Sequence, residues 1–237
     1  MSAVSSVLAS DANRNVMLYW DNNMLDWGEV EPYPQGIIAV REKWRRFCPG
    51  WRVTLYSRET AWLFLRDKHG EDIAELFSTC AVAAMRADFF RVFWAIAEGG
   101  IYTDLNYVPK REPFFVDPAK RLSVARRSDN GTIMNRFFFS KKDCEEMKLI
   151  ANEIIDAVGK REIPCILHAT GPGAWTRTLS QIGTSGMSIL NWEDLLGNFI
   201  ERRNYGHTTR GTSQYWKKLQ LRMSIYQNPP EMFGRKR

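Results

Sequence analysis

The sequence has few features that would cross-link the chain or anchor it in a membrane. Its four cysteines are far apart and none is part of a Cys-x-x-Cys pair, so we expect reduced thiols rather than a disulfide framework or a zinc site. No run approaches eighteen apolar residues, and the N-terminal sequence MSAVSSVLAS lacks the basic start and long apolar core of a secretion signal. We therefore expect a cytoplasmic protein with no transmembrane segment.

Long clusters of positive charge are also lacking. The net charge is +6 and the isoelectric point is near 9.2, but Lys and Arg are spread over many segments in short clusters such as Arg45-Arg46 and residues 235–237. A nucleic-acid-binding domain typically combines a basic stripe with exposed aromatic side chains. The nine tryptophans keep this alternative open, but aromatic residues at these spacings are more often part of a core. We expect no nucleic-acid partner.

The rest of the sequence is typical of one α/β domain. With 237 residues and 44% hydrophobic content, the chain can bury a large core. We expect a frayed segment at residues 1–15, a domain at 16–226 and a basic tail at 227–237. A buried strand at 16–20, an amphipathic helix at 35–47, a strand at 51–56 and a helix capped by Ser57 alternate as βαβα. This order predicts a mostly parallel sheet flanked by helices.

The most informative stretch is residues 86–106, RADFFRVFWAIAEGGIYTDLN. It reads as the end of a helix at about 79–98 that is apolar on nearly all sides, a stop at Gly99-Gly100, a short strand and the triplet Asp104-Leu105-Asn106. Groups at the carboxyl ends of strands in an open α/β sheet face the ligand crevice. We therefore expect Asp104 in a binding site.

Two charges stand out in the predicted apolar helix. Asp88 and Arg91 are three residues apart, so their side chains share a helix face. Burying a charged side chain is costly unless it is paired or has a functional role. This pair could bind the vicinal hydroxyls of a sugar, since Asp88 is a hydrogen-bond acceptor and the Arg91 guanidinium offers several donors. Taken alone, an ordinary intrahelical ion pair is the better interpretation, because such pairs are common.

The neighbouring motifs favour the sugar site. Pro49-Gly50-Trp51 leading into a strand, Arg86-Ala87-Asp88-x-x-Arg91, and Gly99-Gly100-Ile101-Tyr102-x-Asp104-x-Asn106 resemble the glycosyltransferases with a DXD-type sugar-binding region. That family includes the initiating mannosyltransferases of fungal glycan synthesis and, more distantly, the large clostridial glucosylating toxins. The similarity covers most of residues 16 to 217, through further segments at Asn135-Arg136-Phe137-Phe138, at 169–173 and at His207 to Trp216.

The resemblance implies a GT-A-like fold and transfer of a sugar from a nucleotide diphosphate donor, UDP- or GDP-linked, to a hydroxyl of a glycan or another acceptor, with retained anomeric configuration. No carboxylate is singled out as a nucleophile or base, so the catalytic residue is unknown. A core position remains an equal alternative for Trp20, and residues 204–216 read as a loop that closes over the diphosphate. The donor-binding residues that the resemblance implies are Tyr19, Trp20, Asp88, Arg91, Asp104, Asn135, Ser213 and Trp216.

The resemblance also implies a metal site formed by Asp104, Asn106 and His207, which would hold Mn²⁺ or Mg²⁺. The chain departs from the family here, because the family has a second carboxylate where this sequence has Asn106. An amide oxygen ligates hard cations but adds no charge. Three alternatives follow: a weaker Mn²⁺ site, which we favour, a transferase that relies on basic residues instead of a metal, or a sugar- or nucleotide-binding relative that has lost turnover.

Overall fold

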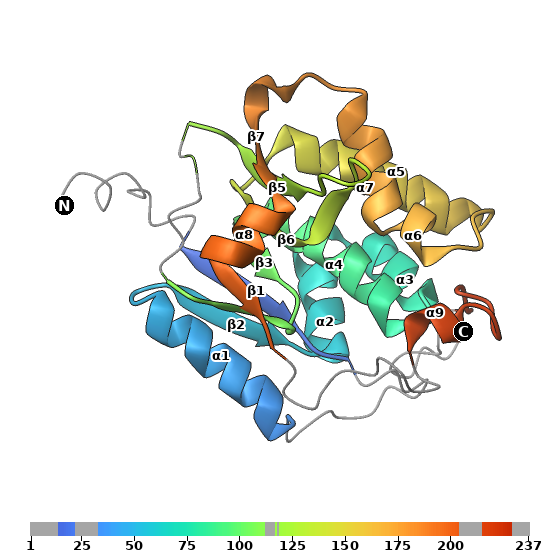
Figure 1. Ribbon diagram of the computed structural model, residues 1–237. Coiled ribbons are helices and arrows are strands. Elements are labelled where there is room, and N and C mark those ends of the chain that lie inside the picture. Colours follow the sequence, from blue (N-terminus) through green and yellow to red (C-terminus); the bar gives the residue numbers. More distant parts are fainter. Residues whose placement is uncertain (1–13, 22–32, 112–116, 118, 204–214, 229–237) are drawn as a thin grey trace.

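A six-stranded sheet runs through the centre of the computed structural model, which describes residues 14–21, 33–111, 117, 119–203 and 215–228 (Figure 1). The strand order is β2-β1-β3-β6-β5-β7. Only β6 is antiparallel to its neighbours, and the other pairs are parallel. The predicted mostly parallel sheet is thus confirmed. Its strands are β1 (Asn15–Tyr19), β2 (Arg52–Tyr56), β3 (Gly100–Thr103), β5 (Leu122–Arg126), β6 (Ile133–Ser140) and β7 (Met187–Asn191).

Helices cover both faces of this sheet (Figure 1). Helices α2 to α7 pack on one face around a core that includes Phe90, Phe138 and Trp175, and α1 and α8 cover the other face around Trp44 and Phe137. A small antiparallel sheet of β4 (Tyr107–Pro109) and β8 (Ile200–Arg202) lies beside α1 and α8. The helices are α1 (Gln35–Phe47), α2 (Arg58–His69), α3 (Glu71–Thr79), α4 (Ala83–Glu98), α5 (Glu145–Lys160), α6 (Ile166–Ala169), α7 (Pro172–Ser180), α8 (Trp192–Asn198) and α9 (Trp216–Leu219), with a 3-10 turn at Thr184–Gly186.

Local sequence explains several of these elements. All five residues of β1 are buried, as expected for a central strand covered on both faces. Helix α2 begins after Ser57, whose hydroxyl accepts from the Thr60 backbone N–H while the Thr60 hydroxyl accepts from Ser57 N–H. This reciprocal cap satisfies two backbone donors at the helix start. Pro172 occupies the first turn of α7, where its missing N–H costs nothing.

Two predicted helix boundaries are wrong. The central helix begins at Ala83 rather than near residue 79, because Cys80 forms a β-bridge with Tyr226 and Ala81 N–H donates to the Ile225 carbonyl. The sequence from Tyr215 to Tyr226 favours a final basic helix, but the structure has only α9 there, four residues long. Both errors have one cause, since pairing between segments far apart in sequence holds residues 80–82 and 225–226 extended.

The described helices include none that is both long and apolar enough to span a bilayer.

Candidate functional site

Three charged side chains meet at the junction between α4 and the carboxyl end of β3. The Arg91 guanidinium lies 2.9 Å from the Asp88 carboxylate, one turn earlier on α4, and 3.4 Å from Oδ1 of Asp104. Asp88 and Arg91 are buried, whereas the side chain of Asp104 is 31% exposed. The sequence predicted that these three residues share one site, and the structure brings them together with the exposed carboxylate at the strand tip.

Two neighbours fix the geometry of this cluster. Asn135, on β6, donates from its amide nitrogen to Asp88 at 2.8 Å, and its backbone carbonyl accepts from Arg91 at 2.7 Å. The Tyr102 hydroxyl donates to Oδ1 of Asp104 at 2.7 Å, and its ring lies under the Arg91 guanidinium at 4.2 Å. Such a connected polar network is rigid because each buried group has a partner. Asn135 was predicted, and Tyr102 was not assigned a role.

Burial raises the pKa of Asp88 to about 6, even though Arg91 and Asn135 act to lower it. The neighbouring Asp104 charge acts in the same direction as burial. Burial also raises the pKa of the Tyr102 hydroxyl well above its usual value, and the charge of Asp104 adds to this effect. Tyr102 therefore stays protonated and remains a hydrogen-bond donor to Asp104.

The Asp104-Leu105-Asn106 turn is held from its other side by backbone and side-chain bonds. Asp104 N–H donates to the Arg136 carbonyl at 2.9 Å, and Arg203 N–H donates to the Asn106 carbonyl at 2.8 Å. The Arg136 guanidinium lies 3.3 Å from the Tyr107 hydroxyl. The turn therefore has a fixed conformation, with a second guanidinium behind it.

Two of the three predicted metal ligands, Asp104 and Asn106, lie within the described residues. Asp104 uses Oδ1 for Tyr102 and Arg91, which leaves Oδ2 as a ligand, and the amide oxygen of Asn106 is a second hard donor two residues later. Mg²⁺ and Mn²⁺ bind with one or two protein oxygens when phosphate oxygens and water complete the shell. No cluster of three His, Cys, Asp or Glu side chains suited to a metal occurs within the described ranges, and His207 lies outside them. The donor set fits a weakly held cation.

A second buried network, which sequence reasoning missed, lies at the carboxyl end of β1. Arg86 binds both oxygens of Asp21, at 2.6 and 3.1 Å, and the Tyr19 hydroxyl donates to Asp21 at 2.8 Å. Burial acts to raise the pKa of Asp21, but Arg86, together with the Tyr19 hydrogen bond and the charge of Arg58, holds that pKa below its usual value. Tyr19 is therefore part of this network and its ring packs on Phe90. The signal in the sequence was Arg86, a charge in an apolar helix.

The remaining predicted residues lie apart from the Asp88 cluster or outside the described chain. Trp20 follows β1, donates its backbone N–H to Tyr56 and is partly buried against the core of the α1 face. Trp216 begins α9 and packs on the core of the opposite face. His207 and Ser213 lie outside the described residues.

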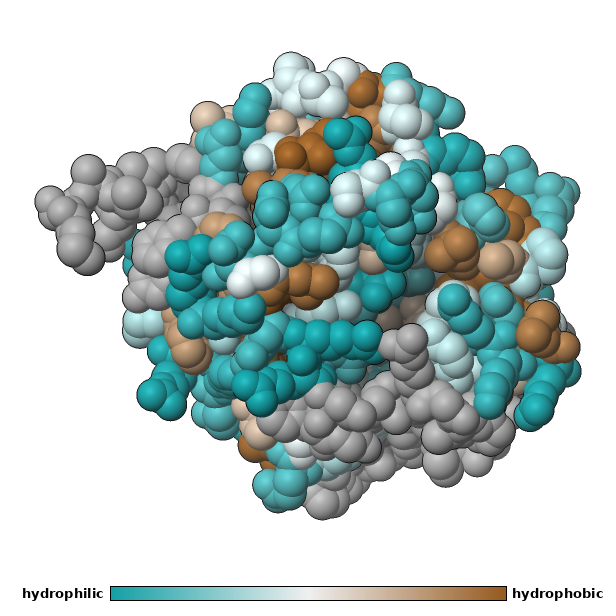
Figure 2. Space-filling model, viewed as in Figure 1, coloured by the Kyte–Doolittle hydropathy of each residue, from teal (hydrophilic) through white to brown (hydrophobic). Residues whose placement is uncertain are grey.

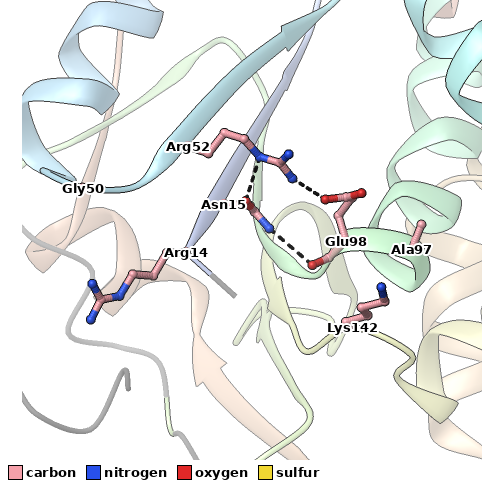
Figure 3. A pocket seen from close by; sticks show the side chains of 7 residues that line it. All are labelled: Arg14, Asn15, Gly50, Arg52, Ala97, Glu98 and Lys142. Atoms are coloured by element: carbon pink, nitrogen blue, oxygen red, sulfur yellow. Dashed lines mark hydrogen bonds and ion pairs between the residues drawn. The ribbon is translucent and has the colours of Figure 1, made fainter. Parts of the chain in front are cut away.

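A cavity of about 520 Å³ lies at the opposite end of the strands (Figure 3). Its walls carry an ion pair between Arg52 and Glu98, and Asn15 donates to the carbonyls of Glu98 and Gly99 at the end of α4. These bonds hold the α4–β3 connection against β1. None of the described residues that line the cavity belongs to the Asp88 cluster.

Taken together, the structure is a mostly parallel, helix-covered sheet with a carboxylate, an amide and an arginine at its carboxyl edge, the edge at which open α/β sheets bind their ligands. Residues 34–123 match the family model described as glycosyltransferase sugar-binding region containing DXD motif. This region includes Asp88, Arg91, Asp104 and Asn106.

A solved structure agrees with this fold. The chain is similar to the PaToxG glycosyltransferase, with a TM-score of 0.57 and 14% identity over 75% of this chain and 74% of that one. The glycosyltransferase GlyE of Streptococcus pneumoniae TIGR4 is more distant, with a TM-score of 0.45 and 12% identity over 78% of this chain and 46% of that one. The comparison with curated proteins found no match. The match of residues 34–123 and the similarity of fold confirm the resemblance expected from the sequence and support the expected transferase class.

Proposed function

We propose that this glycosyltransferase moves a sugar from a nucleotide diphosphate donor, UDP- or GDP-linked, to a hydroxyl of a glycan or another acceptor. One observation carries the proposal: Asp88, Arg91 and Asn135 form a buried, fully connected network that ends at the partly exposed carboxylate of Asp104. A network of this kind offers fixed acceptors and donors to a polyhydroxylated ligand, which favours one orientation of the sugar. Retention of configuration follows from the family resemblance.

The residues have separate roles in this proposal. Asp88 accepts from sugar hydroxyls, and Arg91 holds Asp88 and Asp104 at a fixed separation. Tyr102 keeps the Asp104 carboxylate oriented by occupying Oδ1, which leaves Oδ2 toward the donor. Asn135 fixes Asp88 from the β6 side. The resemblance adds Trp20 for the nucleotide base, and Ser213 and Trp216 for the diphosphate.

A divalent cation fits beside Asp104 and Asn106, with His207 as a further ligand implied by the resemblance. Bound there, Mn²⁺ or Mg²⁺ would neutralise charge on the departing nucleoside diphosphate. Because Asn106 contributes no charge, we expect the free protein to hold the cation weakly and to bind it together with the donor.

Thermal unfolding with a panel of nucleotide sugars, with and without Mn²⁺, tests the proposal. A donor at a hundred times its Kd adds about 2.7 kcal/mol to the free energy of unfolding, and we expect one donor to do so more strongly with Mn²⁺. Asp104→Ala should remove the shift measured against its own ligand-free midpoint. Asp72→Ala, at an exposed position on α3, is the matched control. An unchanged shift in Asp104→Ala would overturn the proposed site.

The second candidate is a sugar- or nucleotide-binding relative without turnover, and Asn106 is the observation that favours it. The two candidates differ in one measurement, because both bind the donor but only a transferase releases nucleoside diphosphate from it. Release by the wild-type protein with Mn²⁺ would exclude the binding-only candidate.

A further inference from the structure

The positive charge of the chain, although spread over many segments, is concentrated toward its C-terminus. Residues 202–237 contain nine Lys and Arg and one Glu, whereas residues 1–201 contain 24 basic and 26 acidic residues, a net charge of −2. No acidic residue occurs between Glu201 and Glu231. A charge difference of this kind between two parts of a chain indicates an anionic partner for the basic part.

Within this basic part, the described residues 216–223, which we term the C-terminal turn, also expose apolar side chains. The turn has the sequence WKKLQLRM. Leu221 is 83% exposed, the highest value among the large hydrophobic side chains that are exposed in the described chain, and Met223 is 36% exposed. Lys217 and Arg222 are exposed as well, and the Lys217 ammonium lies 5.5 Å from the ring centre of Trp216.

The C-terminal turn is held firmly at both ends. On its N-terminal side, Leu219 packs on the core, and Gln220 accepts from the Ile166 N–H at 3.3 Å. After it, Ile225 is 2% exposed and its carbonyl accepts from Ala81 at 2.8 Å. Leu221 is therefore presented outward by anchored neighbours. A leucine held outward by anchored neighbours is accessible to a partner.

Neighbouring surface extends the apolar character. Leu167 on α6 follows Ile166, whose N–H donates to Gln220, and is 37% exposed. In Figure 2 the visible face is mostly hydrophilic, and its hydrophobic surface lies in separate patches, some of them on the side of α5, α6 and α9. Scattered apolar side chains are normal on protein surfaces. The C-terminal turn differs because its highly exposed Leu221 lies next to exposed basic side chains.

We infer that the C-terminal turn docks on an anionic lipid bilayer, with Leu221 and Met223 entering the headgroup region and Lys217 and Arg222 binding acidic headgroups. Basic side chains interleaved with exposed apolar ones are the pattern of segments that lie in the membrane interface. A nucleic acid backbone would attract the cations but would offer Leu221 no apolar environment.

The C-terminal turn is connected to the part of the sheet that carries the proposed sugar site. The turn is followed by Tyr226, which bridges to Cys80, and the Cys80 carbonyl accepts from Arg86 at 2.8 Å. Arg86 in turn binds Asp21 at the carboxyl end of β1. The C-terminal turn is therefore joined through four residues to the edge of the sheet where the donor is proposed to bind, although docking itself does not depend on that proposal.

Flotation of the full-length protein with lipid vesicles tests the inference. We expect binding to phosphatidylcholine vesicles that contain phosphatidylserine, little binding to phosphatidylcholine alone, and weaker binding as salt is raised. A Lys or Arg near an anionic surface strengthens binding about fivefold. Arg222→Gln should therefore weaken binding about fivefold, and Leu221→Ser about tenfold, because the apolar contact is lost.

Matched control variants distinguish binding by the C-terminal turn from binding through the overall charge or hydrophobicity of the protein. Arg46→Gln removes an exposed cation from α1, and Leu63→Ser removes a half-exposed leucine from α2; neither should change vesicle binding. The inference would be overturned by the absence of binding to anionic vesicles, by controls as harmful as the turn variants, or by Leu221→Ser binding as well as wild type. That last result would indicate a purely electrostatic partner.

Discussion

At Asp88, burial and ion pairing act in opposite directions on one carboxyl group. Burial dominates and raises its pKa to about 6, while Arg91 and Asn135 still bind it. The group is therefore ionised at neutral pH but close enough to its pKa to gain a proton in mildly acidic solution. A charge poised in this way is typical of functional sites.

We predict that Asp88 makes the protein less stable as pH rises from about 4 to about 6. An unfolded Asp releases its proton near pH 3.9, whereas the folded protein keeps that of Asp88 up to about 6. The folded state thus binds more protons in this window, so its contribution to the free energy of unfolding falls as pH rises through it. Urea unfolding across this range should show the slope in wild type and not in Asp88→Asn. Parallel curves would contradict the assignment.

Donor affinity should have the opposite pH dependence. Below about pH 6 Asp88 gains a proton, so its ion pair with Arg91 weakens and it no longer accepts from sugar hydroxyls through a full negative charge. We expect the donor Kd to rise as pH falls through 6, with this dependence lost in Asp88→Asn. Titration calorimetry at several pH values measures it.

Arg91 is the residue whose geometry is hardest to replace. Its guanidinium contacts Asp88, Asp104 and the carbonyls of Ala87 and Asn135. Lysine keeps the charge but lacks the planar fork, so we predict that Arg91→Lys loses about 3 kcal/mol of stability or more, as when a buried pair is broken, and most of the donor shift. Arg177→Lys, at a partly exposed pair with Glu153, should cost less than about 1 kcal/mol. Equal losses in the two variants would refute this prediction.

Asn106 offers a gain-of-function test. Asn106→Asp places a second carboxylate two residues after Asp104 and should tighten Mn²⁺ binding, since carboxylates are the preferred oxygen ligands of hard cations. Titration of Mn²⁺ by electron paramagnetic resonance measures affinity without reference to turnover. A matched Asn130→Asp change, at an exposed position before β6, should leave the affinity unaltered. If Asn106→Asp binds no better than wild type, the turn is not a cation site.

At the level of elements, the short connection between α4 and β3 determines where the site forms. Gly100 has φ of +115°, and a Cβ there would lie 2.4 Å from the Asn15 carbonyl oxygen. Only glycine allows this close approach, which lets β3 pair with β1 and brings Asp104 back to within reach of Arg91. The helix and the strand thus place their charges together because the turn between them is so tight.

Gly100→Ala should therefore be strongly destabilising. The unfavourable φ costs about 1–3 kcal/mol, and the clash with the backbone of Asn15 adds to it. Gly159→Ala is the control, because this residue lies in α5 with nothing within 4 Å of the added Cβ and should stabilise by up to about 1 kcal/mol. Denaturant midpoints of the two variants should move in opposite directions, and a neutral Gly100→Ala would disprove the packing argument.

The elements that sequence predicted well are those with strong local signals. The apolar period of residues 35–47, the Ser57 cap and the Gly99-Gly100 stop are all signals between residues close in sequence, and the structure has α1, α2 and β3 at these places. The start of α4 and the short α9 were missed because tertiary pairing of Cys80 with Tyr226 outweighs helix propensity. No local sequence pattern predicts that Cys80 pairs with a residue 146 positions away.

For the whole molecule, the sheet collects residues that are distant in sequence along one edge. Spacing and resemblance predicted Asp88, Arg91, Asp104 and Asn135 as one site, and they are in contact. The Asp21–Arg86 pair and the role of Tyr102 were not foreseen, because each depends on a side-chain direction that the order of strands sets. Sequence patterns identify charged residues in otherwise apolar segments, and the arrangement of the strands determines which of these residues are in contact.

Release of nucleoside diphosphate from UDP- and GDP-sugars, measured with Mn²⁺ for wild type and for Asp104→Ala, tests the central claim most directly. If the Asp88–Arg91–Asp104 cluster holds a nucleotide sugar for transfer, wild type releases nucleoside diphosphate from one of these donors, and Asp104→Ala, folded as judged by circular dichroism, loses nearly all of that release. Equal release by both proteins, or none by wild type with any donor, would contradict it.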